Sequence, residues 1–244
     1  MRIFLPFLLI SLFFNAQSIE TDRPDQTEST SLVPKNFIQI EAGFLYEKNN
    51  SELVQNPLIL WKYGLTNFLE LRVQTDYEII KNPEEKLSGY SPLIIGFKGK
   101  ITEENKILPA ISALSHFSYG KWASKAYQSN QWSYDFRLLF NHTLSEKFTL
   151  GYNVGGEWDF DGEELKKLYT LSLSYAVDDK FACFFETYGF YNSMDRADNR
   201  LDFGFTYLVS KNFQLDASSG LGLSATSPDY FISAGISYRF NVSK

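Results

Sequence analysis

From residue 36 onward the chain alternates apolar and polar residues with a period of two. In the segment 69–79, one face carries Leu69, Leu71, Val73, Thr75, Tyr77 and Ile79, while polar and charged residues occupy the other face. The same alternation recurs at 132–141 and at 230–240. Successive side chains of a β-strand point to opposite faces, whereas no long window here has the 3.6-residue period of a helix. The pattern therefore predicts an all-β chain.

Two kinds of connection separate the alternating segments. Short polar turns are predicted at 65–68, 102–105, 144–148, 177–181 and 209–213. Longer polar links are predicted at 48–55, 81–90, 120–131, 159–166, 192–199 and 224–229. These five turns and six links join twelve strands and leave both ends of the strand region on the side of the short turns.

The polar face carries charged residues in strand after strand. Soluble β-proteins bury an apolar face and rarely a charged one, but here the face opposite the charges is dense in Phe, Tyr, Leu and Ile. Alternating segments with an apolar exterior and a polar interior are typical of a transmembrane barrel. We therefore predict a 12-stranded antiparallel transmembrane β-barrel over residues 36–244, with periplasmic termini and six outward loops. Its lumen-lining residues should be Glu41, Lys62, Glu70, Arg72, Asp76, Lys98, Asp135, Arg137, Glu157, Asp202, Asp216 and Arg239.

Composition narrows the function classes. Aromatic residues make up 17% of the chain, and those at strand ends, such as Trp61, Trp132 and Tyr238, suit the aromatic girdles of a barrel. A mean hydropathy of −0.23 excludes a protein with several transmembrane helices. A net charge of −6 argues against nucleic acid as a partner. One cysteine and two histidines leave little for a disulfide framework or a metal centre, and we expect no metal and no cofactor.

The N-terminus has the features of a secretory signal. Arg2 precedes an apolar run at 3–14 that is too short to span a bilayer as a helix. We predict a signal peptide over residues 1–18, cleaved after Ala16 or within two residues of it. Residues 19–35 follow as a polar segment without periodicity. This segment is either a solvated lead-in to the first strand or a plug folded into the lumen, where its charges would pair with lumen groups.

One pair of residues could carry catalysis. His116 and Ser118 flank Phe117, so both side chains lie on one face of a strand, and a histidine can activate a neighbouring serine. A lipid-hydrolysing barrel would need this pair on its outer surface, but the alternation places both residues in the lumen. We expect an ordinary polar lumen pair and no enzyme. The acidic run at 159–164 lacks the ligand spacing of a calcium loop and indicates a solvated loop.

The start of the mature chain resembles a known family. Glu20, Asp22, Arg23, Pro24, Asp25 and Glu28, followed by the segments 32–35 and 39–43, are similar to the N-terminal signature of the phenol meta-degradation-pathway family of transporter-like outer-membrane β-barrels. The signal ending at 14–17 resembles those of Bacteroidota. The resemblance implies passage of aromatic or other hydrophobic compounds, and it implies no catalytic or ligand-binding residues.

These observations predict a protein of the bacterial outer membrane that passes small solutes, including aromatic or hydrophobic ones, passively. With five basic and seven acidic residues in the lumen, any ion selectivity should lean weakly towards cations. We expect outer-membrane lipids as partners, a monomer, and no nucleic acid. Two alternatives remain: a barrel with a closed lumen whose loops, such as 120–131, bind a partner, and the lipid-modifying enzyme.

Overall fold

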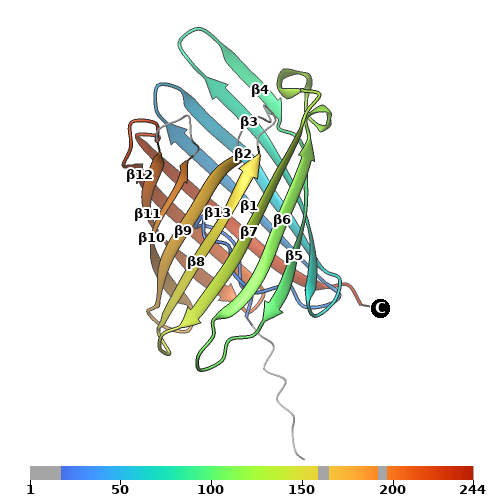
Figure 1. Ribbon diagram of the computed structural model, residues 1–244, viewed down its shortest axis with the longest axis vertical. Coiled ribbons are helices and arrows are strands. Elements are labelled where there is room, and N and C mark those ends of the chain that lie inside the picture. Colours follow the sequence, from blue (N-terminus) through green and yellow to red (C-terminus); the bar gives the residue numbers. More distant parts are fainter. Residues whose placement is uncertain (1–17, 159–164, 192–196, 244) are drawn as a thin grey trace, which may run out of the picture.

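The computed structural model describes residues 18–158, 165–191 and 197–243. Within these residues almost every segment of regular structure is a strand (Figure 1). The strands are β1 (Phe37–Lys48), β2 (Glu52–Gly64), β3 (Leu69–Lys81), β4 (Lys86–Tyr90), β5 (Ile94–Thr102), β6 (Ala110–Tyr119), β7 (Trp132–Thr143), β8 (Phe148–Trp158), β9 (Leu165–Ala176), β10 (Phe181–Tyr191), β11 (Asp198–Ser210), β12 (Phe213–Gly222) and β13 (Tyr230–Asn241).

Antiparallel pairing closes the sheet on itself. Apart from β4, strands that are consecutive in the chain pair with each other, so that β3 pairs with β5 and β1 pairs with both β2 and β13. The closing ladder runs from Phe37 opposite Asn241 to Lys48 opposite Tyr230. Short β4 pairs only with the outer end of β3, so twelve of the described strands form the ring. Closure leaves no unpaired strand edge inside the bilayer, and it confirms the predicted 12-stranded antiparallel barrel.

The alternation sorts side chains between lipid and lumen as the sequence predicts for a membrane barrel. Leu173, Phe185 and Phe203 lie side by side in register on β9, β10 and β11, and all three are exposed on the outer surface. Their neighbours Ser172, Glu186 and Asp202 are equally in register and buried on the inner face. None of the helical segments among the described residues is long and apolar enough to cross a bilayer.

Three connections differ from the predicted ones. The link predicted at 48–55 is a turn over 49–51, because the Asn49 side chain accepts the backbone N–H of Ser51 at 2.7 Å and tightens it. The predicted link 81–90 contains β4, whose Tyr90 ring packs edge-on against Tyr77 at 5.2 Å. The turn predicted at 102–105 extends to residue 109, since Pro109 offers no N–H for the ladder.

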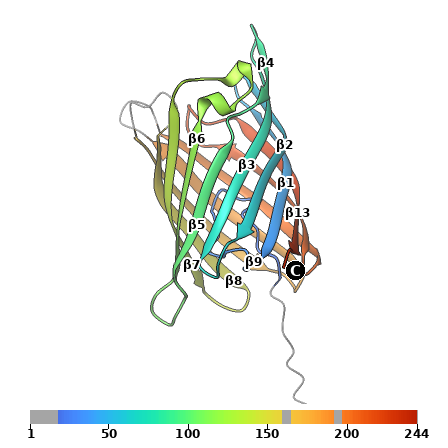
Figure 2. The ribbon, with the colours of Figure 1, turned by 90° about the vertical axis from the view of Figure 1, so that its right-hand side faces the viewer.

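The two ends of the barrel differ. Figure 2 shows β4 projecting beyond one end, beside the link 120–131, which contains two 3₁₀ turns at Gly120–Trp122 and Lys125–Tyr127. The C-terminal strand ends at the opposite side, among the short turns (Figure 1). This is the arrangement predicted for outward loops and periplasmic turns.

Introducing a charge on the outer face tests whether this face of the strands contacts lipid. Phe203 is 58% exposed in the middle of β11, and the change Phe203→Arg would place a cation in lipid. We expect it to lower the free energy of unfolding by about 2–4 kcal/mol, measured by urea denaturation in phospholipid vesicles. Phe203→Leu keeps the position apolar and serves as the control. Equal stability of the two variants would contradict the assignment of this face to lipid.

Candidate functional site

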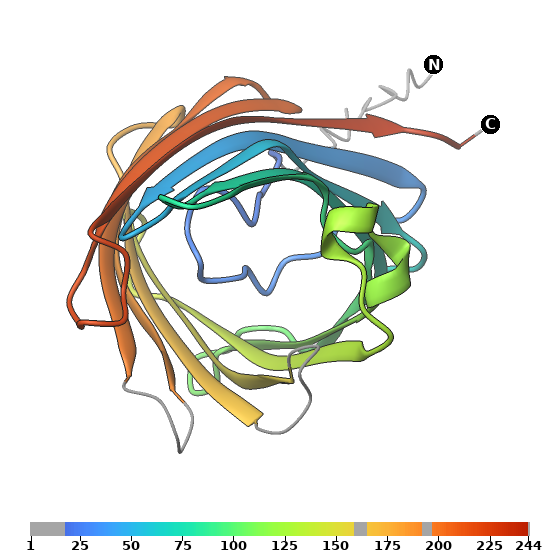
Figure 3. The same ribbon diagram turned by 90° about the horizontal axis from the view of Figure 1, so that it is seen from above.

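Residues 19–35 run inside the barrel as an irregular segment, which we call the lumen segment (Figure 3). It enters among the short turns, where the Ile19 N–H donates to the Lys211 carbonyl at 2.8 Å. Further along, the Ser112 hydroxyl donates to the Thr30 carbonyl at 2.7 Å. The segment leaves the lumen at Asn36 and continues into β1. Of the two arrangements that the sequence left open for residues 19–35, the structure has the inserted one.

Side chains of the wall satisfy the backbone of the lumen segment. A buried peptide without regular structure needs hydrogen-bond partners from elsewhere. Glu41 accepts the backbone N–H groups of Asp22 and Arg23, each at 3.1 Å. The other acceptors are Glu186 for Gln26, Asn153 for Glu28 and Glu70 for Val33, each at 2.7 Å. Carboxylates of the wall thus hold the segment by its main chain.

Asp22 joins three buried cations of the wall. Its carboxylate lies 2.7 Å from Lys62 Nζ, 2.8 Å from Arg72 Nη1 and 2.8 Å from Lys98 Nζ. All four side chains are almost completely buried. Burial alone would raise the pKa of Asp22, but these three cations hold that pKa well below its usual range. Asp22 is therefore an anion, and one cationic side chain from each of β2, β3 and β5 contacts it.

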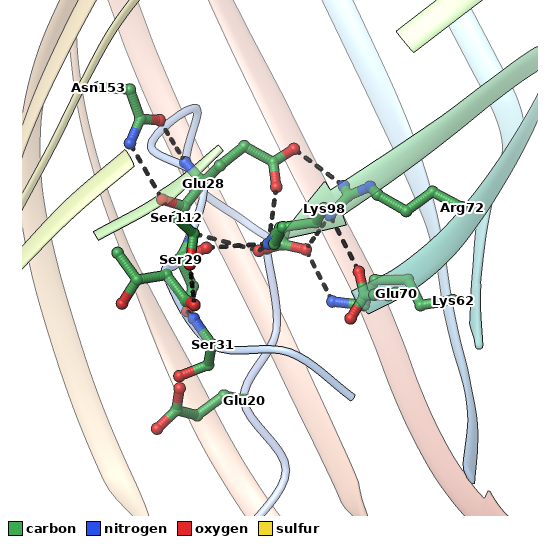
Figure 4. A network of polar contacts seen from close by, with 12 residues as sticks. Glu20, Glu28, Ser29, Ser31, Lys62, Glu70, Arg72, Lys98, Ser112 and Asn153 are labelled. Carbon is green, nitrogen blue, oxygen red and sulfur yellow. Dashed lines mark hydrogen bonds and ion pairs between the residues drawn. The ribbon is translucent and has the colours of Figure 1, made fainter. Parts of the chain in front are cut away.

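Further acidic groups complete this charge cluster (Figure 4). Glu28 of the lumen segment contacts Arg72 at 3.0 Å and Lys98 at 3.3 Å. From the wall, Glu70 lies 3.4 Å from Arg72, and Glu41 pairs with Lys62. Four acidic residues therefore surround the three cations, and two of them, Asp22 and Glu28, come from the lumen segment.

Arg23 reaches the opposite wall. Its guanidinium lies 3.0 Å from the Asp216 carboxylate and donates to the Ser233 hydroxyl at 2.9 Å. Gly43 and Gly235 face each other across the β1–β13 ladder. A Cβ atom on either would collide with the Arg23 side chain, so the glycine pair provides the space that Arg23 fills.

A second acidic group surrounds Asp25. Burial and the neighbouring carboxylates of Glu186 and Asp202 raise the pKa of Asp25 well above its usual range. Glu186 also accepts hydrogen bonds from the Gln26 N–H and the Thr27 hydroxyl. The Asp25 carboxyl retains its proton more readily than an ordinary carboxyl. The cluster of Asp25, Glu186 and Asp202 therefore carries less negative charge than three ionised carboxylates would.

The remaining lumen-lining residues lie towards the outer end or at the periplasmic rim. Asp76 accepts a hydrogen bond from the Gln74 amide at 2.9 Å, and Arg239 donates to Asn212 at 3.1 Å. Asp135, Arg137 and Glu157 line the cavity above the lumen segment. The residues predicted for the lumen therefore fall into four places: the Asp22 cluster, the Arg23 and Asp25 contacts, the outer part of the lumen, and, for Arg239, the periplasmic rim.

Sequence reasoning missed Glu186, although its side chain is completely buried in the lumen. The reason is that β10 has aromatic residues on both faces, with Phe184 and Tyr188 inside and Phe185 outside. The alternation there does not separate an apolar from a polar face. Pairing with β11 could have found it, because Glu186 lies opposite Asp202.

Two cavities lie on either side of the lumen segment. A cavity of about 390 Å³ on the periplasmic side is lined by residues of the lumen segment and by Thr149, Ser174 and Thr206 of the wall. A second, of about 440 Å³, lies towards the outer end. Arg23, Pro24, Asp25 and Glu28 line both. The segment thus forms a constriction between two polar spaces.

The His116–Ser118 pair does not assemble as a nucleophile and its base. The Ser118 hydroxyl donates to the Leu93 carbonyl at 2.8 Å, whereas His116 Nδ1 lies 2.9 Å from the Asp135 carboxylate. Both residues lie on the lumen side, away from lipid. Among the described residues, no group of three or more His, Cys, Asp or Glu side chains is placed to hold a metal ion. The acidic run 159–164 and the predicted signal cleavage site lie outside the described residues.

Comparison with known proteins identifies the family. The family model described as "Putative MetA-pathway of phenol degradation" matches residues 21–240. The chain belongs to this family, which confirms the resemblance seen in the N-terminal signature. A comparison with curated proteins finds no match.

Solved structures show the same fold. An outer membrane channel from Pseudomonas putida F1 is 15% identical, with a TM-score of 0.72, covering 91% of this chain and 100% of that one. The NanC porin is 8% identical, with a TM-score of 0.58 and coverage of 82% and 98%. The KdgM porin is 11% identical, with a TM-score of 0.57 and coverage of 82% and 99%. The fold of this chain is that of bacterial outer-membrane barrels, as its alternation predicts.

Neutralising Asp22 tests the central charge cluster. Asp22→Asn leaves three buried cations without their shared anion, and we expect the free energy of unfolding to fall by about 3–5 kcal/mol. Urea denaturation of the refolded protein measures this change.

Glu20→Gln provides a matched control in the same segment. The Glu20 side chain is exposed and lies outside the buried cluster, with Arg239 at the rim as its electrostatic neighbour. Its neutralisation should change stability by about 0.5 kcal/mol at most. If both variants were equally stable, Asp22 would not hold the cluster together.

Proposed function

We propose that this protein is a passive channel of the outer membrane for small polar solutes, among them small aromatic compounds that carry polar groups. The observation that supports the proposal most strongly is the pair of polar cavities on either side of the lumen segment, inside a barrel with a lipid-facing apolar exterior. The matched structures include an outer membrane channel and two porins, and the family description refers to phenol degradation.

The lumen favours polar over purely hydrophobic solutes. Its walls are charged at several levels, and an apolar solute would displace water from these groups without replacing their hydrogen bonds. The cavity above the lumen segment is lined by eight acidic and three basic side chains, and of the acidic ones Asp22, Glu28 and Glu41 are paired with buried cations of the wall. We therefore expect small cations to pass somewhat more readily than small anions.

The lumen segment sets the width of the passage. It is held by Asp22, Arg23, Glu28 and backbone hydrogen bonds to both walls. So many simultaneous contacts make release of the whole segment costly. Solutes would pass along the docked segment, which limits the passage to small molecules.

Single-channel recording in a planar bilayer tests this function. We expect discrete, ohmic, small current steps, with a reversal potential in a salt gradient that indicates a weak preference for cations. Deleting residues 19–35 should enlarge the steps severalfold, because the constriction is removed. Glu146→Gln, in an exposed short turn away from the cavities, leaves the segment docked and is the control, which should conduct like the original protein.

Absence of current from correctly folded protein would contradict the channel and favour the barrel with a closed lumen. Steps of unchanged size after the deletion would contradict the role of the segment. Heat-modifiable migration on a gel, which reports barrel folding, distinguishes either result from misfolding.

A further inference from the structure

A third cavity lies at the outer end of the lumen and has a different character from the two others. Its volume is about 470 Å³, within the range of small-molecule sites. It is lined by Arg137 of β7, Lys166 of β9, Tyr188 and Phe190 of β10, and Arg200 of β11. Gln26 of the lumen segment also lines it. Three basic and two acidic side chains surround it, and it adjoins the more acidic cavity, with which it shares Arg137, Glu157 and Arg200.

Arg137 is the notable group in this cavity. It is 8% exposed, and its Nε has no hydrogen-bond partner among the residues that the structure describes. The nearest acidic side chain on its own strand, Asp135, directs both carboxylate oxygens to His116 Nδ1, at 2.9 and 3.1 Å. Gly155 lies opposite Arg137 in the β7–β8 ladder and leaves room for its side chain. The Asp135 carboxylate also interacts electrostatically with Arg137, but within the described part of the chain the buried Nε still lacks a hydrogen-bond acceptor, which is unfavourable until a ligand supplies one.

Arg200, a second cation of this cavity, is already paired with carboxylates. Arg200 lies 2.7 Å from Asp198 and 2.8 Å from Glu47. Asp198 accepts a further hydrogen bond from the Ser227 hydroxyl. Arg200 and Asp198 therefore neutralise each other, and Arg137 is the group best placed to bind an incoming anion.

Aromatic rings form the apolar side of the cavity. Tyr188 and Phe190 pack edge to face with their centroids 6.1 Å apart. The Arg200 guanidinium lies 5.9 Å from the centre of the Tyr188 ring and fixes its position. A planar apolar ligand would gain contact with these rings in addition to its charge.

We propose that this cavity binds a single-ring aromatic carboxylate, with the carboxylate on Arg137 and the ring against Tyr188 and Phe190. A guanidinium matches a carboxylate through two parallel hydrogen bonds. The site rests on the proposed function in one respect: the cavity opens onto the outer end of the same lumen, so its ligand is a solute that the channel admits.

Calorimetric titration of the folded, full-length protein with benzoate tests the site. We expect saturable binding that is about tenfold or more tighter than that of benzyl alcohol, which lacks the charge, or of acetate, which lacks the ring. Arg137→Gln should abolish the preference for benzoate over benzyl alcohol. Arg137→Lys keeps the charge but loses the paired hydrogen bonds, and should give intermediate affinity.

Lys121→Gln is the control, because it removes one positive charge from the exposed 120–131 link. It should bind benzoate as the original protein does. Arg137→Gln removes a side chain whose buried Nε has no hydrogen-bond partner among the described residues, and it should fold normally, as gel migration of the unheated barrel would show. If this folded variant still bound benzoate, or if acetate bound as tightly as benzoate, the proposed site would be wrong.

Conductance of the same preparations separates this inference from the channel itself. Current without benzoate binding would overturn the site and leave the channel. Benzoate binding without current would support the site and overturn the channel.

Discussion

Three cations buried inside the barrel wall require anions close to them. Lys62, Arg72 and Lys98 project from neighbouring strands into the lumen, and each contacts Asp22. A buried charge is tolerated only when it is paired and hydrogen-bonded. Wall carboxylates supply part of this compensation, but Asp22 and Glu28 come from the lumen segment. The buried cations are therefore fully paired only when the segment is docked. The segment acts as part of the lumen wall for this reason.

This constraint shapes the passage. The docked segment separates a periplasmic cavity from an outer one and lines both. Its anions neutralise the central cations, so a polar group that remains available to a solute lies elsewhere, at Arg137 beside two aromatic rings. A solute entering from outside would meet Arg137 and the rings of Tyr188 and Phe190 before it reached the constriction formed by the segment. Size and polarity, rather than a catalytic group, would then determine what passes.

Much of this arrangement could be predicted because a barrel imposes a period of two on every strand. The alternation indicated the fold, the lipid-facing side and the charged lumen residues. It missed Glu186, because β10 has aromatic residues on both faces and its apolar and polar faces are not distinct. It also misplaced the ends of turns where a side chain or a proline decides them, as at Asn49 and Pro109. The docking of residues 19–35 was left open, because an aperiodic segment finds its partners through contacts between residues far apart in the chain, such as Arg23 with Asp216.

Locking the lumen segment to the wall tests most directly whether the docked state is the conducting one. The hydroxyls of Thr27 and Thr170 lie 2.7 Å apart, so Thr27→Cys with Thr170→Cys would allow a disulfide, in a background with Cys183→Ser to remove the native thiol. We expect the oxidised protein to conduct like its reduced form, because solutes pass beside a segment that stays in place. Loss of current on oxidation, restored by reduction, would contradict this account and show that the segment must leave the lumen before anything passes.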